Sequence, residues 1–314
     1  MKAPVLAARD PYMERTTTAR SLPDCGGIDV FDSLLVRQRV DDADAARTAV
    51  AAWTDGRDGD VHDLLPVEGV TLATLFLDRG PASDERPGPG RGDGDALLWY
   101  LEVVDDDVPA WRDPARTVRE ASPLFDGPLA DRLAGATAHR GGGGDGDHLL
   151  LTHATHPRRQ ERYAEHCGPS LVAPVAGDDL PIPVAVVTLR LRPGLRSRLT
   201  WHAGRLVDRL KSVDAVDRRA REQTDVIEAE AMYSESLLLE RRPASEGHLL
   251  HYYMETESME RLYEAYEASD DWATRLSDWL FRRLLLSTDA ERLLVPPLES
   301  DCEVLVHAVD PDRP

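Results

Sequence analysis

The second half of the sequence holds a group of side chains suited to proton transfer beside an anionic ligand. Glu235 and His251 carry a carboxylate and an imidazole, the two groups that most often act as acids and bases, and Arg190 is a fixed cation. Tyr253 and Glu255 follow His251 at intervals of two residues, the spacing that puts side chains on one face of a β-strand. Such a set is typical of a site that binds an anionic or enolic molecule and moves its protons.

Alternation along the strands that must carry these residues indicates how they are placed. In the strand predicted for residues 184–192, Arg190 lies opposite an apolar face that we expect to lie under helices. If the polar faces of the strands at 184–192, 231–241 and 249–255 all point into the space between two sheets, their side chains line one cavity. We then expect Glu235 and His251 to be catalytic. The ligand-binding residues would be Arg190, Tyr233, Tyr253 and Glu255. The structural alternative is a buried salt-bridge network, or an exposed sheet edge.

Other histidines offer weaker signals. His153 and His307 occupy matching places in the two halves, and haem ligation by either one stays open, although no specific haem motif surrounds them. His148, His153 and His156 come close together in sequence, but strand spacing sends the first two to opposite faces, so we expect no metal site. The sequence contains no phosphate-binding loop, no dinucleotide fingerprint, no H-E-x-x-H and no nucleophile elbow. No cofactor is expected.

Composition indicates a cytoplasmic, salt-adapted protein. The formal charge is −20, and Lys2 and Lys211 are the only lysines among 37 basic residues. At molar salt the Debye length is about 3 Å, so such an acidic surface is screened rather than self-repelling. The rival interpretation is an acidic face for a basic partner, whereas nucleic acid is disfavoured. Three distant cysteines, no apolar run of membrane-spanning length and no signal-peptide core favour a reducing cytoplasm.

Hydrophobic periodicity predicts eight strands in two groups of four. A helix is predicted after the first strand of each group, and helical segments between the third and fourth strands. In the helix that begins near Leu195, residues Leu199, Ala203 and Leu206 recur at steps of four and three, which makes this helix amphipathic. The strands are predicted at residues 33–40, 70–77, 96–104 and 148–155, and then at 184–192, 231–241, 249–255 and 302–309.

The two groups match as an internal repeat. Val36-Arg37-Gln38-Arg39 resembles Leu189-Arg190-Leu191-Arg192, and two later strands match at nearly the same separation of about 150 residues. Each half therefore predicts a βαββαβ ferredoxin-like unit, and the two units are expected to pack sheet to sheet as an intrachain pseudo-dimer, in the α+β class. The predicted division is a flexible leader at 1–27, a first repeat at 28–157, a linker at 158–183 and a second repeat at 184–314.

The first repeat is predicted to be degenerate. In this alignment the first half retains only one of the candidate site residues, an arginine, with Arg37 in the place of Arg190. Any site is therefore assigned to the second half. The other alignments pair Glu235 with Ala73, His251 with Trp99, Tyr253 with Leu101 and Glu255 with Val103.

The duplicated βαββαβ pattern resembles the dimeric α/β-barrel superfamily, which includes small monooxygenases, muconolactone-isomerase-like proteins and haem-handling branches. Within it, AMYSES at residues 231–236 and LHYYME at 250–255 are similar to an uncharacterised haloarchaeal family. The resemblance implies a fold and no particular activity, because members of one fold carry out unrelated reactions.

Three functions therefore compete. The leading hypothesis is a protein that binds a small molecule in a polar cleft of the second repeat. The enzyme alternative is a cofactor-independent monooxygenase or isomerase acting on an aromatic or enolisable substrate, with His251 or Glu235 as base and Arg190 stabilising the anion. The third is a protein-interaction or regulatory module, which predicts a large exposed apolar patch in place of a pocket. The oligomeric state is left open.

Overall fold

A computed structural model gives the structure of the protein. It describes residues 32–55, 61–79, 95–104, 109–122, 124, 148–156, 158–159, 161–162, 171–174, 182–210, 232–268, 279–294, 300 and 302–310. The predicted leader at 1–27 lies outside these residues, as do most of the linker at 158–183 and the Gly- and Asp-rich stretch before residue 95.

The described strands form two antiparallel sheets, which places the protein in the α+β class. The first sheet has the order β1 (Asp32–Arg39), β3 (Ala96–Val103), β2 (Val70–Asp78), β9 (Cys302–Val309) and β5 (Leu171–Pro174). The second has the order β4 (His148–Thr155), β7 (Met232–Glu240), β8 (Leu249–Thr256) and β6 (Val184–Arg190). The eight predicted strands are all present near their expected bounds, whereas β5 lies in the predicted linker and was not expected.

The last strand of each half lies in the sheet of the other half. β4 pairs with β7, and β9 pairs with β2, in antiparallel registers that run nearly the whole length of the strands. The βαββαβ pattern predicts instead that each half builds its own sheet. Because each sheet borrows one strand, the backbone hydrogen bonds of either sheet require both halves of the chain.

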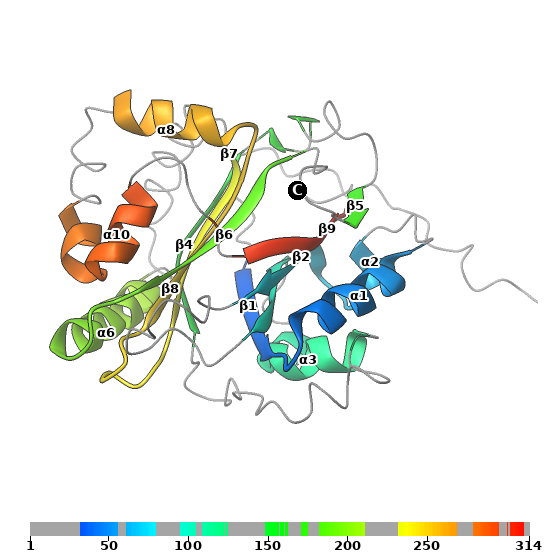
Figure 1. The fold of residues 1–314 in the computed structure, drawn as a ribbon, viewed down its shortest axis with the longest axis horizontal. Coiled ribbons are helices and arrows are strands. Elements are labelled where there is room, and N and C mark those ends of the chain that lie inside the picture. The colour runs from blue at the N-terminus through cyan, green and yellow to red at the C-terminus, as the bar shows by residue number, and fades with distance from the viewer. Residues whose placement is uncertain are drawn as a thin grey trace, which may run out of the picture.

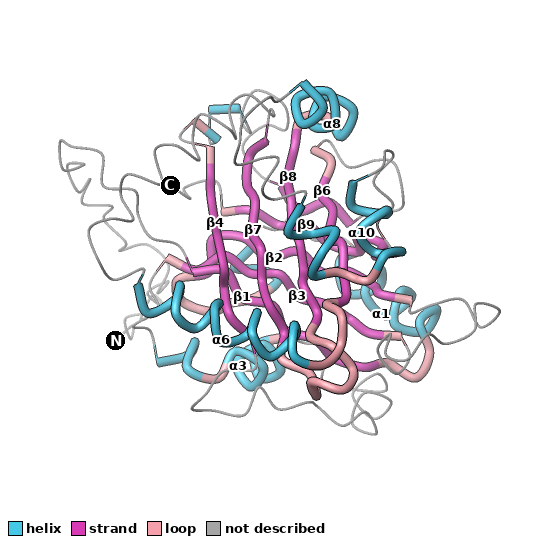
Figure 2. Tube along the Cα trace, turned by 90° about the vertical axis from the view of Figure 1, so that its left-hand side faces the viewer, coloured by secondary structure: helices cyan, strands magenta, loops and turns pink. Residues whose placement is uncertain are grey.

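Helices cover the outer faces of the two sheets, and the inner faces pack against each other (Figure 1). On the first sheet these helices are α1 (Ala43–Thr54), α2 (Val61–Leu64), the 3-10 turn η1 (Pro109–Arg112) and α3 (Pro114–Ala121). On the second sheet they are α6 (Leu195–Leu210), α8 (Met259–Ala268) and α10 (Ser287–Leu294). Figure 2 shows the second sheet face on, with α8 at one end of its strands and α6 toward the other. A separate apolar cluster joins the inner faces, including Phe76 and Tyr100 from one sheet and Val186 and Tyr253 from the other.

The strand registers correct the alignment of the two halves. Thr74 on β2 lies opposite both Tyr100 and His307, and Ser236 on β7 lies opposite both Tyr253 and His153. Tyr253 therefore occupies the place of Tyr100, whereas the sequence alignment had paired Tyr253 with Leu101. The third strand was aligned one residue out of register, and such a slip exchanges the two faces of a strand.

With the corrected register, Glu102 occupies the place of Glu255. Both halves thus carry a Tyr-x-Glu sequence on the third strand and a histidine on the fourth. The prediction that the first half retains only an arginine is wrong. The error arose because every residue of β3 is buried, so its sequence shows no alternation to fix the register.

Two glycines occupy positions where a Cβ would collide with neighbouring atoms. Gly247, just before β8, has a φ of +84°, and a Cβ there would lie 2.1 Å from the carbonyl oxygen of Leu191. In α6, Gly204 lets the helix approach β4 closely, because a Cβ there would lie 2.9 Å from Leu151 Cδ2. Among the described helices, none is long and apolar enough to cross a bilayer.

Candidate functional site on the second sheet

The structure separates the two residues predicted to be catalytic. His251 pairs with Thr188 and Leu238 and faces the first sheet, where Leu238 belongs to the apolar cluster between the sheets. Glu235 pairs with Met254, which packs against α8 on the opposite face of the same sheet. The expectation that Glu235 and His251 line one cavity is therefore wrong. The polar residues of neighbouring strands alternate out of phase, which no single strand reveals.

The four predicted ligand-binding residues are also dispersed. Tyr253 and Glu255 face the first sheet, and their side chains form a 2.6 Å hydrogen bond with the tyrosine hydroxyl as donor. Tyr233 joins the same inner cluster rather than the face of Glu235, because the register shifts between Met232 and Ser234 and interrupts the alternation. Arg190 is buried at the end of β6, where its backbone N–H donates to Asp289 of α10 at 2.7 Å.

A buried ion pair dominates the inner layer. Arg159 Nη1 lies 2.8 Å from Glu102 Oε2, and both side chains are almost completely buried. The other oxygen of Glu102 accepts hydrogen bonds from Ser234 at 2.7 Å and from Tyr100 at 3.4 Å. Burial, together with the charge of Glu102, raises the pKa of Tyr100 well above its ordinary value, so the phenol stays protonated and acts as a donor.

The two tyrosines of the Tyr-x-Glu sequences stack where the sheets meet. The ring centroids of Tyr100 and Tyr253 are 3.4 Å apart, with planes inclined by 11°. The Tyr253 hydroxyl contacts Thr74 on the first sheet at 3.3 Å, and the Tyr100 hydroxyl contacts Ser236 on the second at 2.7 Å. Each tyrosine therefore makes a polar contact with the opposite sheet, which fixes the position of one sheet on the other.

The two histidines raised as haem ligands belong to this inner layer. His307 Nδ1 lies 2.9 Å from the Thr74 hydroxyl, and His153 Nδ1 lies 2.7 Å from the Ser236 hydroxyl. Both imidazoles are held between strands by hydroxyl groups of their own chain. Over the described residues, no group of three His, Cys, Asp or Glu side chains has the arrangement of a metal site.

His251 belongs to a charged cluster at the rim of the inner layer. Its Nε2 lies 2.9 Å from Glu240, and its Nδ1 lies 3.0 Å from the Thr188 hydroxyl. Burial lowers the pKa of His251, so the neutral ring donates from Nε2 to Glu240 and accepts at Nδ1 from Thr188. Burial alone would raise the pKa of Glu240, but His148 and His251 outweigh it and hold that pKa well below its usual range. Arg242 also lies 2.6 Å from Glu240, so this carboxylate is fully paired.

Glu235 has a different environment. It lies in a row of residues that crosses the outer face of the second sheet, where its neighbours are Ala154, Met254 and Ala185. Burial raises the pKa of Glu235, and a hydrogen bond from Tyr252 opposes this only in part. Glu235, Tyr252 and Ala154 are nevertheless all half-buried rather than sealed. The result is a carboxyl group with a raised pKa on a mainly apolar, partly accessible surface.

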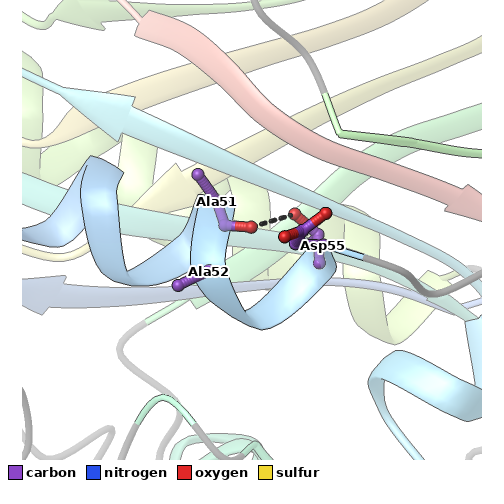
Figure 3. A pocket seen from close by; sticks show the side chains of 4 residues that line it. Ala51, Ala52 and Asp55 are labelled. Atoms are coloured by element: carbon purple, nitrogen blue, oxygen red, sulfur yellow. Dashed lines mark hydrogen bonds between the residues drawn. The ribbon is translucent and has the colours of Figure 1, made fainter.

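One depression in the molecular surface lies far from these groups in the fold. It has a volume of about 410 Å³ and is lined by Ala51, Ala52, Thr54 and Asp55 at the end of α1. The only ionisable side chain among these four is Asp55, whose backbone N–H caps the helix by donating to the carbonyl of Ala51 (Figure 3). The lining offers no pair of groups suited to proton transfer, so the outer face around Glu235 is the better candidate.

The candidate residues divide by how readily they could be found from sequence. Glu235 and His251 were predicted, whereas Tyr252 and Glu102 were given no role in the site. Tyr252 is a polar aromatic at an otherwise apolar position, and that exception was the available signal. Arg159 gave no signal in the sequence, because its partner Glu102 lies on a distant strand.

Comparisons with known proteins identify only loosely similar structures. No family model matches the sequence, and no curated protein matches it. The fold is similar to the crystal structure of an anthrone oxidase-like protein, with a TM-score of 0.33 and 12% identity over 90% of this chain and 91% of that one. It is also similar to a protein described as a candidate monooxygenase from Fusobacterium nucleatum, with a TM-score of 0.38 and 9% identity over 90% of this chain and 96% of that one.

Proposed function

We propose that the protein binds a small, mainly apolar molecule with an enolisable carbonyl group on the outer face of its second sheet. Glu235 exchanges a proton with that molecule. The observation that carries the proposal is the environment of this carboxyl group, which has no cationic partner among the described residues and a pKa raised by burial. A structural carboxylate is normally paired, as Glu102 and Glu240 are.

The surface around Glu235 suits the class of ligand. Its row contributes Ala154 and Met254, and the adjacent row contributes Leu237 and Tyr252. Met259 and Leu262 of α8 close one side. Apolar walls with few polar groups are typical of small-molecule sites, and here the polar groups of these two rows are the carboxyl of Glu235, the phenol of Tyr252 and the hydroxyl of Thr152, which pairs with Leu237. A flat aromatic or unsaturated ring fits such a surface better than a multiply charged ligand.

The reaction is a proton transfer between carbon and oxygen. Ionised Glu235 removes a proton from the carbon next to the carbonyl, and the electron pair of that C–H bond forms the enolate. Glu235 then gives a proton to the oxygen or to a carbon of the enolate, either the one it removed or one exchanged from solvent, so the enzyme ends unchanged and no cofactor is consumed. A general base works best when its pKa lies near the working pH, and burial moves Glu235 in that direction. Tyr252 is a positioning residue, because it touches the carboxyl group that reacts.

Hydrogen–deuterium exchange at carbon tests the proposal directly. A panel of small aromatic ketones and β-dicarbonyl compounds is incubated with the protein in D₂O, and loss of the α-proton signal is followed by NMR. We expect at least one compound to exchange faster with the wild type, and Glu235→Gln to remove about 100-fold or more of that acceleration. Tyr252→Phe should shift the pH dependence of exchange, since the hydrogen bond that opposes the raised pKa is lost.

A matched control is available on the same side of the sheet. Glu264 is an exposed carboxylate on α8, and Glu264→Gln should leave the exchange rate unchanged. Equal exchange with wild type and Glu235→Gln for every compound would show that Glu235 has no catalytic role. Oxygen consumption separates two reactions that share the enolate: an isomerase works equally well under nitrogen, whereas a monooxygenase requires dioxygen as a second substrate and consumes it.

The inner layer is not part of the proposed site. Its carboxylates and histidines are already bound to partners on neighbouring strands, and the His251 cluster lies on the other side of the sheet from Glu235. If His251→Gln abolished exchange as completely as Glu235→Gln, while both variants kept the wild-type stability, the site would have to be moved to the inner layer.

A further inference from the structure

The apolar side of α6 faces away from the protein. Leu195, Leu199 and Leu206 are 71%, 57% and 58% exposed, although steps of four and seven residues between leucines normally mark the face that a helix buries. α6 packs on its own sheet through other residues, among them Trp201 and Gly204. The helix thus has two apolar faces: one is buried on the sheet, and the leucines of the other are exposed.

A second segment next to α6 also exposes apolar side chains. Trp279 is 52% exposed and Leu280 is 37% exposed, on the helical residues 279–284. This segment adjoins the start of α6, because Arg196 Nη1 donates to the carbonyl of Arg283 at 2.9 Å. The five residues of the α6 surface are Leu195, Leu199, Leu206, Trp279 and Leu280. Exposed apolar side chains that gather on adjacent helices indicate an interaction site.

The charge around the α6 surface is opposite to that of the chain as a whole. Exposed arginines border it on α6 at Arg196 and Arg198 and on the second segment at Arg282 and Arg283. No acidic residue occurs between Leu195 and Leu206, or in residues 279–286, although the chain has a net charge of −20. A basic rim on an acidic protein favours a partner of negative charge. An amphipathic helix with acidic residues beside an apolar stripe carries both the charge and the apolar side chains that would match this surface.

We propose that the α6 surface binds an acidic amphipathic helix of another protein, with the apolar stripe of that helix on the leucines and its carboxylates on the bordering arginines. A second copy of this chain fits less well, because two α6 helices facing each other would bring their arginines together. The proposed contact lies on an element separate from Glu235, so it adds an interaction to the proposed activity and does not depend on it.

A designed peptide tests the chemistry of this surface. The probe is a fluorescein-labelled helix of about 20 residues with leucine at the i, i+3, i+4 and i+7 positions and glutamate elsewhere, and fluorescence anisotropy reports binding. The same peptide with lysine in place of glutamate is the matched probe. We expect the acidic peptide to bind at least about tenfold more tightly than the basic one, in the lowest salt that preserves the circular dichroism spectrum.

Variants connect binding to the named residues. The double change Leu199→Gln and Leu206→Gln, and separately Arg198→Glu, should each weaken binding of the acidic peptide about tenfold or more. Arg119→Glu on α3, an exposed arginine on the other sheet's helices, should change binding less than about twofold. All of these side chains are exposed, so folding is retained.

Three results would overturn the proposal. The first is equal binding of the acidic and basic peptides, or binding that survives the leucine and Arg198 changes. The second is a concentration-dependent dimer in sedimentation experiments that Leu199→Gln dissociates, which would identify a second copy as the occupant. The third is that the acidic peptide fails to bind, whereas phosphatidylglycerol vesicles bind the wild-type protein and do not bind the Leu199→Gln variant. That result would identify an anionic membrane surface as the partner.

Discussion

Replacement of Arg159 by methionine tests whether the inner layer is held together by its buried ion pair. Methionine keeps most of the length of the side chain but removes the guanidinium that lies 2.8 Å from Glu102. In the variant the carboxylate retains hydrogen bonds from Ser234 and Tyr100. It then stands as a buried charge without this cation, and no water reaches it in the folded state because Glu102 is fully buried.

The expected cost follows from those contacts. Breaking a buried pair by removing one partner costs about 3–5 kcal/mol, because the remaining charge is uncompensated. The two hydroxyl donors left on Glu102 keep the cost at the lower end, about 3 kcal/mol, since each hydrogen bond to a charged group contributes about 1.5 kcal/mol or more. Domains are typically stable by about 5–15 kcal/mol, so the loss should be plain in a urea unfolding curve.

The neighbouring arginine provides the control. Arg158 forms an exposed pair with Glu161 at 2.7 Å, and Arg158→Met should cost less than about 1 kcal/mol. Changing both partners, Arg159→Met with Glu102→Leu, should restore most of the stability because neither partner is then left as an unpaired buried charge.

The pH dependence of Arg159→Met follows from the burial of Glu102. Without its cation, burial disfavours the ionised form of this carboxyl group in the folded state. The folded form is then favoured below the unfolded pKa and penalised as the pH rises, so the deficit relative to wild type should shrink on acidification. A deficit below about 1 kcal/mol at neutral pH, or one that does not change with pH, would refute the account of Glu102 as a buried ionised group.

Three further predictions concern other parts of the fold. Gly247→Ala should lower the free energy of unfolding by about 2 kcal/mol or more, because the new Cβ meets the Leu191 carbonyl. Gly194 has a similar φ but open space around it, so Gly194→Ala should cost about 1 kcal/mol. Equal costs of the two changes in urea unfolding would contradict this. Because the folded-state pKa of Glu235 is raised, protonated Glu235 stabilises the folded state at low pH, and this stabilisation is lost as the pH rises through the folded-state pKa. The Glu235→Gln variant should therefore gain stability relative to wild type as the pH is raised from 5 to 8. The lowered pKa of His251 has the opposite effect: its contribution is present above about pH 6.5, the unfolded value, and is lost on acidification. The urea midpoint should therefore fall more steeply from pH 7.5 to 5.5 in the wild type than in His251→Gln, and parallel curves would contradict it.

The strands were predictable because each one is a short apolar or alternating segment that can be recognised without knowing its neighbours. In residues 184–190 the apolar face opposite Arg190 was expected under helices, and Val187 and Leu189 do pack there, whereas Val186 packs in the cluster between the sheets. The short strand β5 was missed since four residues inside a Pro- and Gly-rich stretch carry no usable periodicity. Its partner β9 supplies the hydrogen bonds that make it a strand.

The candidate site was less predictable, because it depends on relations between strands. Whether Glu235 and His251 meet is decided by the register of β7 on β8, and the register pairs Glu235 with Met254 and His251 with Leu238. No property of either strand alone specifies that pairing. The bulge next to Ser234 adds a second change of phase, which moves Tyr233 to the inner layer. The amphipathic pattern predicted for α6 is present, but periodicity alone does not say whether the leucine face lies on the protein's own sheet or points outward.

The exchange of end strands explains why the inner layer cannot easily serve as a binding site. β9 lies between β2 and β5 in the first sheet, and β4 completes the second, so the two sheets are tied by the chain as well as by contact. The stacked tyrosines and the Glu102–Arg159 pair fill the space between them, and opening that space would expose ionised groups whose partners lie on the opposite side. The outer faces carry no such constraint. There, the helices that the structure describes leave Glu235 half-buried, so the proposed ligand could reach this carboxyl group without any strand separating.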